Sequence, residues 1–106
     1  MLDALTLPTL IGIKEASPTF FINTGIGDDV TINQGAMICP NTILTTNIII
    51  GKHCLIDRNT NIGHHSTLGD FFTDSPNVTI SGNNNIKNCV FFGVSASTIE
   101  NIYINL

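Results

Sequence analysis

Residues 44–68 read LTTNIIIGKHCLIDRNTNIGHHSTL, and in this stretch every sixth residue, from Leu44 to Leu68, is a large aliphatic one. The same spacing extends from Ile26 to Phe92 with a single interruption at Asp74. A period of six fits neither the 3.6-residue helix nor the alternation of an ordinary long strand. It is typical of short parallel strands that stack as the coils of a solenoid.

Three hexads make one triangular coil of 18 residues, so residues 18 apart should stack. Two columns of large aliphatic residues support this grouping: Ile26/Leu44/Ile62/Ile80 and Ile32/Ile50/Leu68/Ile86. A second inward position is expected four residues after each leading one. We therefore predict an all-β fold, a single-stranded parallel solenoid of about five 18-residue coils. At Asp74 we expect either a local distortion or a weak column.

The repeat also predicts the domain organisation. Residues 1–19 do not keep the period and are expected to form an irregular N-terminal cap or first coil. Residues 20–106 are expected to form the hexapeptide-repeat domain. Asn, Asp and Gly are abundant between the leading positions, as corners with left-handed backbone angles require.

Composition excludes several classes of function. Charged residues make up 11% of the chain and the net charge is -4, which argues against nucleic acid as a partner. No apolar run approaches the ~20 residues that span a bilayer, and the first residues lack a basic region of the kind that begins a secretory signal. The three cysteines (Cys39, Cys54 and Cys89) form no CxxC pair. We expect reduced thiols, no metal site, no membrane partner and a cytoplasmic protein.

The pair His64–His65 stands where the repeat places a solvent-facing corner. Asn47 is expected one coil below His65, and Gly82 one coil above His64. A neutral imidazole at an exposed corner can act as a base near pH 7. A glycine above it permits close approach of a substrate and offers an unobstructed backbone N–H.

Two stretches resemble the hexapeptide-repeat acyltransferases, specifically the bacterial sugar O- and N-acetyltransferases of the sialic-acid and bacillosamine type. They are TILTTNIIIGKHCLIDRNTNIGHHSTLGDFF (42–72) and SPNVTISGNNNIKNCVFFGVSAS (75–97). The segment Ile62–Phe71, which follows I-x-H-x-x-x-[LI]-G-D-F, is more specific than the hexad alone. The resemblance implies a left-handed parallel β-helix, a homotrimer, and acetyl-CoA in a groove between neighbouring subunits. It also implies a sugar or nucleotide-sugar acceptor.

The resemblance assigns roles to five positions of this chain. His64 matches the general base, and Gly82 matches a position whose N–H stabilises the oxyanion of the acetyl group. Val94 matches a residue that lines the cofactor groove. Two positions depart from the family: His65 stands where a carboxylate often orients the base, and Thr73 stands where a histidine contacts the cofactor.

Alternative functions remain open at this point. The chain is shorter than the family's usual members, and we expect it to lack the N-terminal sugar-binding domain and the last C-terminal coils. A non-catalytic β-helix remnant or scaffold module is therefore the main alternative. A metal enzyme of the γ-carbonic anhydrase kind would use His53, His64 and His65, but the expected H-x4-H spacing is absent.

Overall fold

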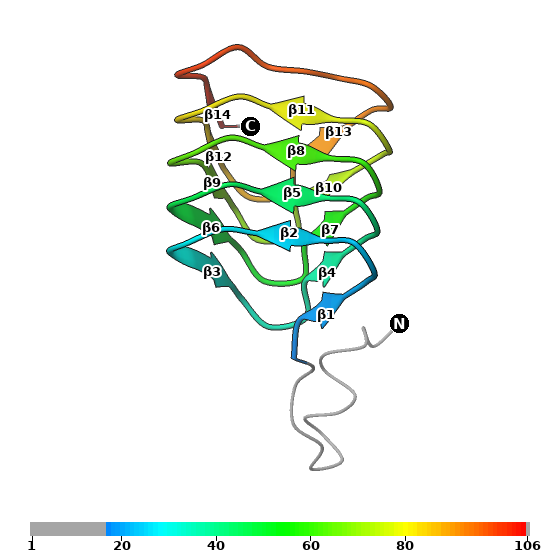
Figure 1. Cartoon of the computed structure of the whole chain (residues 1–106). Coiled ribbons are helices and arrows are strands. Elements are labelled where there is room, and N and C mark those ends of the chain that lie inside the picture. Colours follow the sequence, from blue (N-terminus) through cyan, green and yellow to red (C-terminus); the bar gives the residue numbers. More distant parts are fainter. Residues whose placement is uncertain (1–16, 106) are drawn as a thin grey trace, which may run out of the picture.

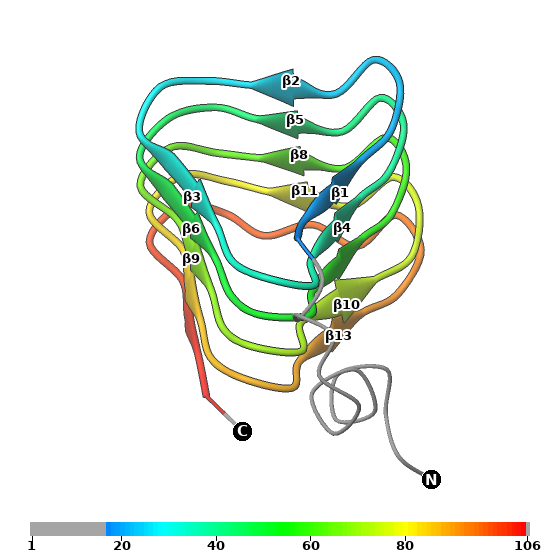
Figure 2. The same cartoon turned by 90° about the horizontal axis from the view of Figure 1, so that it is seen from below.

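The computed structural model describes residues 17–105, and its regular elements are all short parallel strands. They form three flat faces of a triangular prism, seen from the side in Figure 1 and along its axis in Figure 2. The first face contains β1 (Thr19–Phe20), β4 (Met37–Ile38), β7 (Leu55–Ile56), β10 (Thr73–Asp74) and β13 (Phe91–Phe92). The second face contains β2 (Gly25–Ile26), β5 (Ile43–Leu44), β8 (Asn61–Ile62) and β11 (Thr79–Ile80). The third face contains β3 (Val30–Ile32), β6 (Ile48–Ile50), β9 (Thr67–Leu68), β12 (Asn85–Ile86) and β14 (Tyr103–Ile104).

The register of these faces is the predicted 18-residue repeat. Met37 pairs with Leu55, and Ile43 pairs with Asn61 one face further along the coil. Seen from its N-terminal end in Figure 2, the chain turns counterclockwise as it recedes, which is left-handed winding. The predicted left-handed parallel β-helix of about five coils is confirmed, and residues 17–105 contain no helix that could cross a membrane.

The domain boundary expected at residue 19 lies close to the start of the first strand. Residues 1–16 of the expected cap lie outside the described residues. Strand β1 already begins at Thr19 and pairs with β4.

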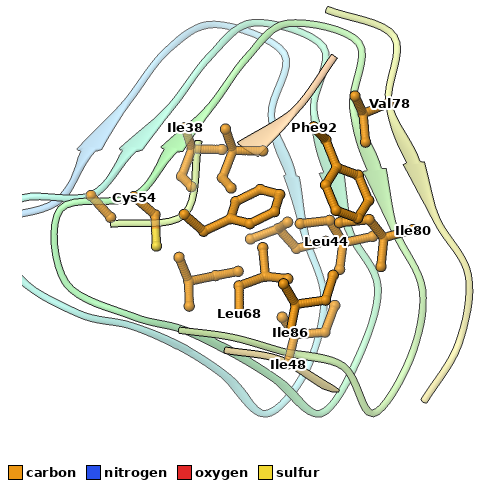
Figure 3. Close-up of a cluster of buried hydrophobic side chains, with 14 of the residues drawn as sticks. Ile38, Leu44, Ile48, Cys54, Leu68, Val78, Ile80, Ile86 and Phe92 are labelled. Carbon is orange, nitrogen blue, oxygen red and sulfur yellow. The ribbon is translucent and has the colours of Figure 1, made fainter. Parts of the chain in front are cut away.

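The core is built from the two inward positions of each hexad. The leading positions from Ile38 to Phe92 are all buried, and so are the positions four residues later from Thr42 to Val90, such as Ile48 and Phe72. Figure 3 shows hydrophobic side chains of this core, among them Ile38, Leu44 and Ile86, inside the coils. Each buried aliphatic side chain contributes on the order of 1.5–3 kcal/mol, so stacked coils stabilise a fold in which no single coil has a core of its own.

The corners of the prism use a left-handed backbone residue at every sixth position. The residues with positive φ are Asn23, Asp29, Gly35, Asn41, Asn47, His53, Asn59, His65, Phe71, Asn77, Asn83, Cys89, Ser95 and Asn101. Asn, Asp and His accept this conformation more readily than other side chains. The predicted Asn/Asp/Gly corners are therefore present.

Asp74 replaces an aliphatic residue in the core, and the structure shows how. Its carboxylate accepts hydrogen bonds from the Asp57 N–H at 2.6 Å and from the Thr60 hydroxyl at 3.0 Å. At the equivalent positions one coil away, the N–H groups of Cys39 and Ser75 donate to backbone carbonyls instead. The expected local distortion is thus an exchange of a backbone acceptor for a side-chain one. Burial raises the pKa of Asp74 to about 6, although both hydrogen bonds lower it.

Candidate active site at the histidine corner

His64 and His65 lie at the corner between β8 of the second face and β9 of the third. The backbone fixes this corner to its neighbours, because the His65 N–H donates to the Thr46 carbonyl at 3.0 Å and the His64 carbonyl accepts from the Asn83 N–H at 2.7 Å. His65 adopts the left-handed conformation with φ 58°. Both side chains are exposed, as the repeat predicted.

The two imidazoles hydrogen-bond to each other and to the coil below. Nδ1 of His64 lies 3.0 Å from Nδ1 of His65, with the rings at 83° to one another. Nε2 of His65 lies 3.0 Å from the amide nitrogen of Asn47. His65 therefore holds the inner nitrogen of His64, which is the orienting position that the resemblance gave it. Asn47, His65 and His64 thus form a row of three hydrogen-bonded side chains.

Gly82 lies directly above His64, but its surroundings differ from the expectation. A Cβ atom added at Gly82 would stand 2.5 Å from Nε2 of His64, so the imidazole fills the space that a side chain would take. Gly82 is buried beside this ring. The Gly82 N–H forms no hydrogen bond with another of the residues 17–105.

A carboxylate that the sequence analysis did not single out reaches the same imidazole. Oε2 of Glu100 lies 3.7 Å from Nε2 of His64, and the two side chains are 65% and 52% exposed. Glu100 is two 18-residue coils above His64, with Gly82 in the coil between them. The column His64–Gly82–Glu100 was the signal that could have identified it.

Asn84 ties the coil of Gly82 to the coil of Glu100. Its amide nitrogen donates to the carbonyls of Ser81, Gly82 and Ile99 at 2.9–3.0 Å. Its own N–H donates to the hydroxyl of Ser66, just after the histidine pair. This buried side chain fixes the backbone from which both Gly82 and Glu100 extend.

Thr73 and Val94 lie on other parts of the prism. Thr73 belongs to β10 on the first face, opposite the histidine corner, and Val94 follows β13 at the corner that leads to the second face. Of the five predicted site residues, residues 17–105 of one chain bring together only His64, His65 and Gly82. Figure 2 shows β10 on a different face of the prism from β8 and β9.

The three histidines, His53, His64 and His65, do not form one cluster. His53 is at the corner between the third and first faces, where its ring stacks on Phe71 at 5.6 Å and covers Gly35. Among residues 17–105, no group of three or more His, Cys, Asp or Glu side chains is arranged to hold a metal ion.

The fold has counterparts in known structures. WeeI from Acinetobacter baumannii AYE superposes with a TM-score of 0.78 and is 31% identical, over 84% of this chain and 42% of that chain. The protein is a hexapeptide-repeat left-handed β-helix. This β-helix spans less than half the length of WeeI. No protein-family model matches its sequence, and no curated protein does.

Acetyltransferases are among the other structural neighbours of this β-helix. A histidine-to-asparagine mutant of perosamine N-acetyltransferase from Caulobacter crescentus, in complex with CoA and GDP-perosamine, has a TM-score of 0.52 and 14% identity. That similarity covers 92% of this chain and 58% of the other. At 14% identity it shows a shared fold and no more. The acetyltransferase domain of PglB from Neisseria gonorrhoeae FA1090, in complex with acetyl coenzyme A, is 17% identical with a TM-score of 0.49, over 92% of this chain and 61% of that domain.

Proposed function

We propose that this β-helix is an acetyl-CoA-dependent acyltransferase, or its catalytic module, that acetylates an amino or hydroxyl group of a sugar or nucleotide sugar. The observation that carries the proposal is the His64 imidazole, which is held on an exposed corner with its inner nitrogen bonded to His65. Nε2 is then the ring nitrogen left for the acceptor, and His64 acts as a general base in the tautomer that leaves Nε2 unprotonated.

The chemistry requires Nε2 of His64 to take up one proton and then to release it. The acceptor nitrogen or oxygen attacks the thioester carbonyl, and His64 takes its proton at Nε2. The C–S bond breaks, and the leaving thiolate receives that proton from His64, which gives the acetylated sugar and free coenzyme A. The Gly82 N–H, which has no acceptor among the described residues, is the candidate donor to the developing oxyanion.

In this proposal, residues of more than one chain form the groove for coenzyme A. Val94 is 66% exposed and Thr73 lies on the first face, away from His64. In a homotrimer, the first face or the Val94 corner of one subunit can meet the histidine corner of the next. Exposed apolar side chains on the faces, such as Met37 and Ile43, fit such an association.

The test compares His64→Asn with His53→Asn in thiol release from acetyl-CoA with a set of amino sugars and nucleotide amino sugars. His53 is a histidine at another corner and serves as the matched control. We expect His64→Asn to lower kcat at least a hundredfold and His53→Asn to leave it within about twofold. Sedimentation of both variants reports whether the trimer is retained. A trimer that releases no thiol with any acceptor and binds no coenzyme A would instead identify a non-catalytic module.

A further inference from the structure

A row of hydrogen-bonding side chains crosses the histidine corner from the coil below to the coils above. Hydrogen bonds join Asn47 to His65 and His65 to His64, both at 3.0 Å, and Nε2 of His64 faces the Glu100 carboxylate at 3.7 Å, an ion-pair distance. Each imidazole uses both of its ring nitrogens in this row. The tautomer of one ring therefore depends on that of the other.

The two ends of the row fix its direction. The amide nitrogen that Asn47 turns toward His65 can only donate, and an ionised Glu100 can only accept. With both rings neutral, His65 therefore accepts at Nε2 and donates from Nδ1. His64 accepts at Nδ1 and carries its proton on Nε2, facing Glu100.

This direction places a proton on the nitrogen that a general base needs free. If the Asn47 amide turns over and presents its oxygen, the Asn47–His65 and His65–His64 hydrogen bonds reverse, and Nε2 of His64 no longer presents a proton to Glu100. His65 then donates from Nε2, His64 donates from Nδ1, and Nε2 of His64 holds a lone pair. We propose that Asn47 is a positioning residue that sets, through His65, which nitrogen of His64 carries the proton. The catalytic consequence rests on the proposed function.

The amide of Asn47 is free to make this turn. The side chain is exposed, and its bond to His65 is the only hydrogen bond that it forms with another residue in the 17–105 range. The backbone at Asn47 is held separately, by donation of its N–H to the Asp28 carbonyl at 3.0 Å. The charged residues of this corner are Glu100 above the row and Asp28 and Asp29 one coil below Asn47.

Two substitutions at Asn47 test whether the orientation of its amide sets the tautomer of His64. In Asn47→Asp the carboxylate can only accept, so it enforces the reversed row. Asn47→Gly removes the side chain and suits the left-handed backbone (φ 54°). Asn59→Asp and Asn59→Gly are the matched controls, because Asn59 is an exposed corner residue with φ 58° at a different corner.

The measurement is 15N NMR of histidine-labelled protein at a pH where both rings are neutral. We expect His65 to be mainly the Nδ1–H form and His64 mainly the Nε2–H form in the unchanged protein. Both should switch in Asn47→Asp, become mixed in Asn47→Gly, and stay as they were in the Asn59 variants. If both tautomers are the same in Asn47→Asp as in the unchanged protein, the proposal is overturned.

Activity supplies a second readout. With an acceptor that supports turnover, Asn47→Asp should raise kcat two- to tenfold while KM for acetyl-CoA changes little. Glu100→Gln should shift the tautomers in the same direction, because it removes the charge that holds the proton on Nε2. If no acceptor is acetylated, the proposed function fails, and the NMR result still decides the role of Asn47.

Discussion

Glu100 approaches His64 across two coils of the β-helix, with 3.7 Å between Oε2 and Nε2. The approach is possible because the residue in the intervening coil is Gly82. A side chain there would occupy the space that the imidazole fills. One glycine thus decides whether a base and a carboxylate that are 36 residues apart can meet.

We expect Gly82→Ala to displace the His64 ring. The added Cβ would stand 2.5 Å from Nε2, and the imidazole can swing outward to relieve the contact. Acetyl transfer should fall at least tenfold, since small misplacements of a catalytic group are costly. The control is Gly25→Ala, whose Cβ makes only an ordinary contact, at 3.6 Å, with Ile43. Equal activity of the two variants would mean that the observed ring position does not matter.

We expect Asp74→Asn to stabilise the protein above pH 6. The native carboxyl has a pKa of about 6 against an ordinary 3.8, so the folded state binds the proton more tightly than the unfolded chain. The contribution of this carboxyl group to the stability is then largest below about pH 4. It falls between about pH 4 and 6 and remains lower above pH 6. The amide can accept from the Asp57 N–H and donate to Thr60 without a buried charge. At pH 8 the substitution should raise the free energy of unfolding by on the order of 1–3 kcal/mol.

Urea unfolding at pH 4, 6 and 8 checks this prediction. The exposed corner substitution Asp29→Asn is the control and should leave the pH dependence unchanged. If Asp74→Asn changes the free energy of unfolding by the same amount at all three pH values, folding does not raise the pKa of Asp74 and the assignment is wrong.

The three thiols should react in the order Cys89, Cys39, Cys54. Cys89 is exposed, whereas burial raises the pKa of Cys39, with Asp57 and Asp74 adding to the effect. Burial raises the pKa of Cys54 to about 11, and its thiol donates to the Gly69 carbonyl. Iodoacetamide labelling at pH 8, followed by peptide mass spectrometry, gives the three rates. Labelling of Cys54 as fast as Cys89 would contradict the inward orientation of this hexad position.

Ile62→Ala should cost far more stability than Ile43→Ala. Ile62 is fully buried in β8, next to the histidine corner, and its truncation leaves a cavity worth about 2–5 kcal/mol. Ile43 lies in the neighbouring strand on the outward side and is 46% exposed, so its loss should cost less than about 1 kcal/mol in the separate chain. Chemical denaturation measures both. A cost for Ile43→Ala that depends on protein concentration would point to an interface on the second face.

The fold was predictable because each hexad repeats the same local requirement. A leading aliphatic residue faces inward, and a left-handed corner follows three residues later. The column at His64 was predictable for the same reason, since residues 18 apart must stack. The carboxylate at Glu100 was harder to identify, because its contact depends on the conformations of two exposed side chains and on the missing side chain at Gly82.

The sequence by itself determined the backbone of this protein: the six-residue period defines three faces, and 18 residues close one coil. It also determined which residues share a column, and so placed His64, Gly82 and Asn47 near one another. Only the tertiary structure decided how their side chains meet. The imidazole occupies the space at Gly82, and the row from Asn47 to Glu100 acquires a direction. These outcomes depend on side-chain rotation and hydrogen-bond polarity, which no residue spacing encodes.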